Sequence, residues 1–151
     1  IDKIAKEGNP DAVHFKRVFL EKDSLDFSFS GLKTAVLNHI NSAKQRGEEI
    51  NRADIASSFQ QAVIEVICQK AVAAAKDMGH GKLVIAGGVA ANSKLRMELE
   101  QQCAQESISL YIPSARLCTD NGAMIGCAAY YKYKEGQKGD LYMDAHANLP
   151  F

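Results

Sequence analysis

The sequence predicts an α/β fold in which helices flank a mixed, largely parallel sheet. Two short apolar runs, at residues 82–86 and 109–112, are bounded by glycine or proline and are typical of short strands, the first of them fully buried. Segments with apolar residues at helical spacing precede, separate and follow these runs. Strands that alternate with helices in this way are typical of parallel sheets, because a crossover helix joins each strand to the next.

The composition is that of an ordinary globular domain. The 151 residues are 46% hydrophobic and 24% charged, with 18 basic and 18 acidic side chains and zero net charge. Zero net charge argues against binding nucleic acid or membranes by overall charge, but it leaves room for a local patch that recognises RNA. No apolar run approaches the roughly 18 residues of a membrane-spanning helix. The chain opens without methionine or a secretory segment. We therefore expect a cytoplasmic protein without membrane association, either processed or cut from a longer chain.

The first half of the chain predicts one strand and two helices. Residues 25–30 alternate strictly between apolar and polar side chains, which is the pattern of a half-buried strand. Ser30 could cap a helix over residues 32–45, where apolar residues recur every four positions. The strongest helical signal covers residues 51–78, with Asn51 as the expected N-cap. Its apolar stripe consists of Ile55, Phe59, Ala62, Val63, Val66, Ile67, Ala71 and Ala74.

The second half continues with two helices and a tail. After the first apolar run, Asn92 or Ser93 caps a helix with an inner face made of Leu95, Leu99 and Cys103. After the second run, residues 119–134 predict a last helix with an inner face made of Ala123, Cys127 and Tyr131. Residues 136–151 turn to glycine, lysine, aspartate and asparagine, which predicts a surface tail beyond a folded unit at 1–135.

Paired glycines follow the first apolar run. Gly87 and Gly88 lie between a strand and the start of a helix, in the sequence AGGVAAN at residues 86–92. A backbone without Cβ atoms admits a flat ligand or a phosphate, and ligands of open α/β sheets bind at the carboxyl ends of the strands. The glycines also fit a tight turn that needs a positive φ, so both interpretations stay open. The pattern is neither a dinucleotide fingerprint nor a P-loop.

A carboxylate follows the second strand in the same way. Asp120 lies at the start of the last predicted helix, in the run CTDNGAM at residues 118–124. Its charge suits the positive end of the helix dipole, and the same position would present a hard oxygen ligand to a metal ion. Spacing alone leaves both interpretations open. Because both loops leave strands of one sheet, we expect them to open onto one cleft.

Cysteine and histidine spacings exclude several kinds of site. No cysteine pair has CxxC spacing, which argues against zinc ribbons and thioredoxin-like sites. We expect buried free thiols in a reducing compartment at Cys68, Cys103, Cys118 and Cys127. No two histidines stand four residues apart, so the chain has no HxxxH or HExxH pair among His14, His39, His80 and His146. No GxSxG elbow is present, and no catalytic residue is assigned.

Four blocks, in order within residues 26–127, resemble those of one enzyme family. They are FSFSGLKTA at 27–35, ADIASSFQ at 53–60, AGGVAANSKLR at 86–96 and CTDNGAMI at 118–125. By these blocks the chain is identified as a member of the TsaD family, once described as a glycoprotease or O-sialoglycoprotein endopeptidase. The family is similar in fold to actin, sugar kinases and heat-shock ATPases (the ASKHA superfold), which implies that this chain is the C-terminal lobe of a two-lobed enzyme.

The resemblance implies a transferase that makes N-threonylcarbamoyl adenosine (t6A) in tRNA. Such an enzyme moves the threonylcarbamoyl group from threonylcarbamoyl-AMP to an adenosine beside the anticodon. Carried over to this sequence, Gly87 and Gly88 form the loop on the adenosine side and Asn92 contacts the nucleotide. Asp120 is then one ligand of an iron or zinc ion whose other ligands are two histidines of an HxxxH motif. The implied partners are tRNA, a paralogous TsaB-like subunit and a small TsaE-like P-loop ATPase.

This chain resembles only the C-terminal half of the family. The HxxxH motif and the first phosphate loop belong to the N-terminal part, and neither occurs here. We therefore expect the isolated chain to be inactive, to bind metal weakly and to self-associate through surfaces that its N-terminal lobe would cover. Two alternatives remain: a zinc glycoprotease, which lacks its signal peptide and HExxH motif here, and a non-catalytic nucleotide-binding paralogue, against which the intact Asp120 argues.

Overall fold

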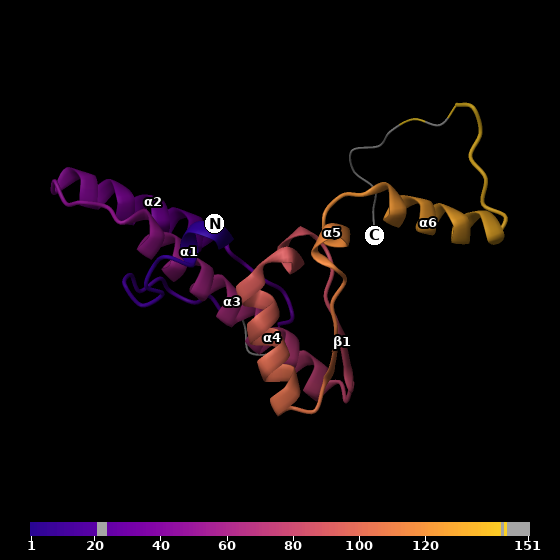
Figure 1. The fold of residues 1–151 in the computed structure, drawn as a ribbon, viewed down its shortest axis with the longest axis horizontal. Helices are drawn as coiled ribbons and strands as arrows, with labels where there is room; N and C mark the ends of the chain where they lie inside the picture. The colour runs from indigo at the N-terminus through magenta and orange to yellow at the C-terminus, as the bar shows by residue number, and fades with distance from the viewer. Residues whose placement is uncertain (21–23, 143, 145–151) are drawn as a thin grey trace.

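The computed structural model describes residues 1–20, 24–142 and 144. The elements follow in the order α1 (Asp2–Ala5), α2 (Ser30–Gln45), α3 (Arg52–Asp77), β1 (Lys82–Val84), the 3-10 helix η1 (Gly88–Ala91), α4 (Ser93–Gln105), β2 (Ser109–Tyr111), α5 (Ala115–Cys118) and α6 (Gly122–Lys134). Figure 1 shows α1 and α2 beside α3 at one end, α4 beside the strands in the middle, and α6 at the other end. The predicted α/β character is confirmed.

The sheet in the described part of the chain has two parallel strands, β1 and β2. Leu83 and Leu110 pack against the core formed with α3 and α4. Val84 and Tyr111, on the opposite face, are 69% and 51% exposed. The parallel arrangement is as expected, but the prediction of a fully buried strand at 82–86 is wrong. No described element covers the outer face of the sheet, so only alternate residues are shielded from water.

The main core lies between α3, α4 and the sheet. The predicted inner face of α4 is confirmed, since Leu95, Leu99 and Cys103 are all buried. The residues of this core are Ile64, Cys68, Val72, Ala75, Leu95, Leu99, Cys103 and Ile108. Helix α3 therefore buries a broader surface than the single predicted stripe, because it packs against α4 and the sheet as well as against α2.

The first 20 residues are fastened to α3. The backbone N–H of Asn9 donates to the Asp54 carboxylate at 2.8 Å. The Ser58 hydroxyl donates to the Asn9 carbonyl at 3.3 Å and accepts from the N–H of Val13 at 3.1 Å. Ser58 is fully buried, so these bonds satisfy a hydroxyl that burial would otherwise destabilise. This attachment supports a second core cluster of Phe15, Leu32, Ile55 and Ala62.

The predicted strand at residues 25–30 is wrong. Residues 24–29 form neither helix nor strand, and Ser30 is the first residue of α2 and forms no side-chain cap. The ammonium group of Lys70 on α3 instead binds the carbonyl oxygens of Ser24 and Asp26. The Phe27 ring lies beneath the same ammonium group, 5.6 Å from it. Alternation alone does not make a strand here, because no described strand lies alongside to complete a ladder.

Asparagine side chains begin three of the helices. The oxygen of Asn51 accepts from two backbone N–H groups of α3, and that of Asn92 accepts from one of α4. Both predicted caps are confirmed. Asn121 caps α6, which begins at Gly122 rather than at residue 119.

Helix α6 buries none of its residues. The predicted inner face of Ala123, Cys127 and Tyr131 is therefore wrong for the described structure, in which α6 stands apart from α3 and α4 (Figure 1). Residues 136–142 are exposed and form neither helix nor strand. Across the described residues, no helix is both long and apolar enough to cross a bilayer.

Candidate functional site at the carboxyl ends of the strands

The two paired glycines differ in what the fold requires of them. Gly87 has φ +85° and ψ 173°, a conformation that side chains with a Cβ rarely adopt. Gly88 has no positive φ, and a Cβ added to it would meet no atom within 4 Å. The turn therefore explains Gly87, as one sequence interpretation held. The turn does not explain Gly88. Because Gly88 has no side chain, its backbone is accessible to a ligand from the solvent side.

Asn92 is held in one orientation by two hydrogen bonds. Its Oδ1 accepts from the N–H of Leu95 at 2.9 Å. Its Nδ2 donates to Oε1 of Gln60 on α3 at 2.8 Å, and Gln60 is buried. One N–H of the Asn92 amide is left for another acceptor. Sequence reasoning missed Gln60, and the available signal was a polar residue within the buried ADIASSFQ block.

A mostly apolar cavity of about 520 Å³ lies beside Gly88 and Asn92. This volume is within the usual range of small-molecule pockets. Its walls come from the start of the chain, the residue before α2, helix α3, η1 and the N-cap of α4: Ile1, Asp2, Phe29, Phe59, Gln60, Val63, Ile64, Gly88, Val89, Ala91 and Asn92.

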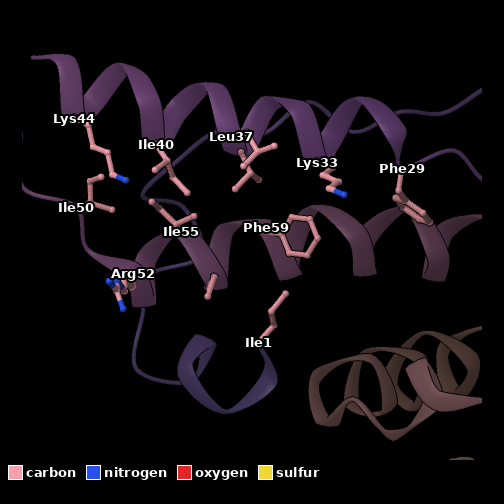
Figure 2. A pocket seen from close by; sticks show the side chains of 12 residues that line it. Ile1, Phe29, Lys33, Leu37, Ile40, Lys44, Ile50, Arg52, Ile55 and Phe59 are labelled. Carbon is pink, nitrogen blue, oxygen red and sulfur yellow. The ribbon is translucent and has the colours of Figure 1, made fainter.

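A larger groove of about 880 Å³ separates α2 from α3. In Figure 2, Ile55 and Phe59 on α3 face Leu37 and Ile40 on α2 across this groove. Lys33, Lys44 and Arg52 also line it, and no acidic residue does. The predicted contacts Gly87, Gly88 and Asn92 are not among its lining residues. Gly88 and Asn92 line the smaller cavity, and Gly87 lines neither.

Asp120 lies in the loop between α5 and α6. The neighbouring Asn121 shapes this loop, since its Nδ2 donates to the Thr119 carbonyl at 2.8 Å and its Oδ1 accepts from the N–H of Met124 at 2.9 Å. Asp120 itself is exposed. Its carboxylate is thus presented at the start of α6 and open to a ligand.

Arg96 joins the two loops that follow the strands. Its Nε donates to the Ala90 carbonyl in η1 at 2.6 Å. Its Nη2 donates to the Pro113 carbonyl after β2 at 2.8 Å and to Sγ of Cys118 at 3.1 Å. Helix α5 also contacts η1 directly. The two loops expected to share a cleft are therefore neighbours, and the residue that connects them was not singled out from the sequence.

The residues present do not make a metal site by themselves. Within the described part of the chain, no three histidine, cysteine, aspartate or glutamate side chains are grouped closely enough to hold an ion. Asp120 supplies one suitable oxygen donor, while Cys118 is buried and hydrogen-bonded to Arg96. His146, considered from the sequence, lies outside the described residues.

The cysteines are free, and three of the four are buried. Burial raises the pKa of the Cys68 thiol to about 12 and also raises that of Cys103. These thiols stay protonated and are poor nucleophiles or ligands near neutral pH. The expectation of buried free thiols is confirmed for Cys68, Cys103 and Cys118, and it is wrong for Cys127, which is exposed on α6.

Comparison with known families decides the relationship. A model of the family TsaD, tRNA N6-adenosine threonylcarbamoyltransferase, matches residues 1–127. The chain belongs to the TsaD family. The matched region contains both strands, the paired glycines, Asn92 and Asp120.

Curated relatives carry the same family description. The chain is 51% identical over 150 residues to a tRNA N6-adenosine threonylcarbamoyltransferase of Moorella thermoacetica, covering 99% of this chain and 44% of that protein. It is 50% identical over 149 residues to the enzyme of that name from Clostridium beijerinckii, with the same shares. The enzyme of that name from Staphylococcus carnosus is 48% identical over 149 residues, covering 99% of this chain and 43% of the relative. The chain thus spans less than half the length of these TsaD relatives.

Proposed function

We propose that this chain is part of a transferase that moves the threonylcarbamoyl group from threonylcarbamoyl-AMP to an adenosine beside the anticodon of tRNA. The observation that carries the proposal is the adjacency of the η1 loop and the loop with Asp120 at the carboxyl ends of two parallel strands. This is where open α/β sheets bind ligands. Membership of the TsaD family supports the reaction and the tRNA substrate.

The proposed roles follow from the backbone surface and the hydrogen-bond donors that remain free for a ligand. Gly88 exposes backbone against which an adenosine or AMP group can lie, while Gly87 supplies the turn. Asn92 offers its remaining N–H to an acceptor atom of that nucleotide, and Gln60 keeps the amide from flipping. Binding and orientation of the donor are thus the work of this chain's own side chains, and orientation lowers the barrier of a group transfer.

Asp120 is proposed as one ligand of the iron or zinc ion of the family. Its carboxylate is a suitable donor, but the described residues do not supply the companions that such an ion needs. The remaining ligands would have to come from outside the described residues.

The proposed architecture is the C-terminal lobe of a two-lobed enzyme with the actin-like ATPase fold, with residues 1–135 as the lobe and 136–151 as a surface tail. The share of its relatives that the chain covers supports this, as do the exposed outer face of the sheet and the exposed α6. The proposed partners are an N-terminal lobe, a TsaB-like subunit and a TsaE-like ATPase. A cytoplasmic location follows from a tRNA substrate.

The test is t6A synthesis by the complete gene product, supplied with tRNA and threonylcarbamoyl-AMP. Asp120→Ala is expected to lower t6A synthesis roughly 100-fold or more and to lower bound metal. Asp77→Ala is the matched control, because Asp77 is an exposed carboxylate at the end of α3 that precedes β1, opposite the carboxyl ends of the strands. Unchanged synthesis and metal content in Asp120→Ala would rule out the proposed ligand role of Asp120. No synthesis by the unsubstituted protein would contradict the proposed function and favour the non-catalytic paralogue.

A further inference from the structure

We propose that Arg96 is a positioning residue that holds the loop after β1 and the loop after β2 in one fixed arrangement. The inference rests on the proposed function, since it concerns how the nucleotide contacts are placed relative to Asp120. Arg96 itself is not proposed to touch the substrate.

The first step is that the sheet ends before either loop begins. β1 and β2 pair over three residues each, and one further backbone bond follows, from the N–H of Ile85 to the Tyr111 carbonyl at 3.1 Å. Beyond it, among the described residues, no backbone hydrogen bond connects residues 86–92 with residues 112–121. The ladder therefore leaves the relative position of the two loops unspecified.

The second step is that one guanidinium group hydrogen-bonds both loops, in addition to the direct packing of α5 against η1. Nε binds the Ala90 carbonyl on one loop, and Nη2 binds the Pro113 carbonyl and the Cys118 sulfur on the other. Ala90 precedes Asn92 by two residues, and Cys118 precedes Asp120 by two. A shift at either end of the guanidinium therefore displaces a proposed functional side chain.

The third step is that this role suits arginine in particular. The guanidinium is planar and permanently charged, and its donors diverge in a fixed fork, so it can bind acceptors on separate segments at once. A lysine ammonium is a compact point charge on a flexible stem and cannot reproduce this geometry. Arg96 is also anchored, because it lies in the first turns of α4, which Asn92 caps.

The experiment compares Arg96→Lys and Arg96→Met with the control Lys94→Gln in the complete gene product. Lys94 lies in the same turn of α4 and faces Glu98 at 3.8 Å, so its substitution removes a charge without touching either loop. We expect Arg96→Lys to increase deuterium uptake in residues 88–92 and 114–121 together, with little change in β1 and β2. We also expect kcat for t6A synthesis to fall roughly 10- to 100-fold while KM for threonylcarbamoyl-AMP stays within about threefold. Lys94→Gln should leave all of these values as in the unsubstituted protein.

The outcomes separate this inference from the proposed function. Unchanged uptake in the two loops, or a kcat within about twofold of the unsubstituted protein, would overturn the positioning role. Uptake that rises evenly through α3, α4 and the strands would also overturn it, because that is the result of general destabilisation. If Arg96→Met does not fold, Arg96→Lys, which keeps the stem and the charge, decides the question. If both loops loosen but the unsubstituted protein makes no t6A, the proposed function fails and the connection between the loops stands.

Discussion

At the scale of single residues, adjacent glycines carry different constraints. Gly87 is fixed by its backbone conformation, whereas Gly88 has an ordinary φ and open space where a Cβ would stand. A substitution at Gly88 can therefore test ligand binding without a large change in the stability of the fold.

Alanine substitutions at these two glycines should affect different properties, stability at Gly87 and ligand affinity at Gly88. We expect Gly87→Ala to lower the free energy of unfolding by about 1–3 kcal/mol, because alanine is strained at a φ of +85°. We expect Gly88→Ala to change it by no more than about 0.5 kcal/mol, but to weaken AMP binding about tenfold or more, because the new methyl group occupies the approach to the backbone. Thermal unfolding and AMP titration by calorimetry measure the two effects. Equal AMP affinity in Gly88→Ala and the unsubstituted protein would contradict the proposed contact.

Residue-level predictions succeeded where the interaction is local. Asn51 and Asn92 cap helices through N–H groups two or three residues away, so a short window of sequence contains both partners. Gln60 and Arg96 were missed because Gln60 binds Asn92 and Arg96 binds Cys118, far along the chain in both cases. Nothing in the surrounding sequence identifies those partners.

At the scale of elements, helix α3 binds the non-helical segment that follows α1 through side-chain contacts. Arg17, in the segment that follows α1, forms a two-bond contact with Glu65 on α3 through Nε at 2.6 Å and Nη2 at 3.1 Å. The hydrogen bond from Arg17 holds the pKa of Glu65 below its ordinary value of 4.5. This contact should make the attachment of the first 20 residues depend on pH.

The sign of that dependence follows from the lowered pKa. The unfolded chain binds a proton at Glu65 more readily than the folded chain, so the contact stabilises the fold above about pH 4.5 and is lost as pH falls through the lower, folded-state pKa. We expect Arg17→Met to cost about 1 kcal/mol at pH 7 and progressively less below pH 4.5. Urea unfolding at a series of pH values from 3 to 7 measures this. Lys76→Met, which removes a more exposed ion pair from the same helix, is the control. A loss that is the same at every pH would contradict the assignment to Glu65.

Elements whose pattern is local in the sequence were predicted well, and elements that need a distant partner segment were predicted poorly. Helices α2 and α3 match their predicted ranges to within a few residues, and α4 has its predicted cap and inner face, because apolar spacing is a local property of the sequence. The alternating residues 25–30 form no strand, because strand formation requires a partner that the alternation does not supply.

At the scale of the whole molecule, large apolar side chains are exposed on both α6 and the sheet. Met124, Ile125, Tyr130 and Tyr131 are exposed on α6, and Val84 and Tyr111 are exposed on the sheet. Surfaces of this kind usually bind another protein surface. In the proposed two-lobed enzyme, residues outside this chain would cover α6.

The reactivity of the Cys127 thiol on α6 can show whether α6 is covered in the complete protein. In the 151-residue chain we expect Cys127 to react quickly with a thiol reagent, while burial protects Cys68, Cys103 and Cys118 and raises the pKa of Cys68 to about 12. In the complete gene product we expect Cys127 to become at least about tenfold slower, because packing of α6 excludes the reagent. Reaction of each native protein followed over time gives the two rates, and the thiols of each are counted after denaturation. Equal rates in the two proteins would argue that α6 stays uncovered, and a Cys127→Ser variant confirms which thiol is observed.

The sequence by itself determined the α/β character, the main helices and the TsaD family, because these depend on local spacing and on four ordered motifs. It also located the two loops that carry the candidate residues. The tertiary structure alone decided that Gln60 fixes Asn92, that Arg96 joins the loops, and that Gly88 is open while Gly87 is constrained. The physical reason is that hydrogen bonds and burial between distant segments depend on how helices and strands pack, and local sequence patterns do not encode that packing.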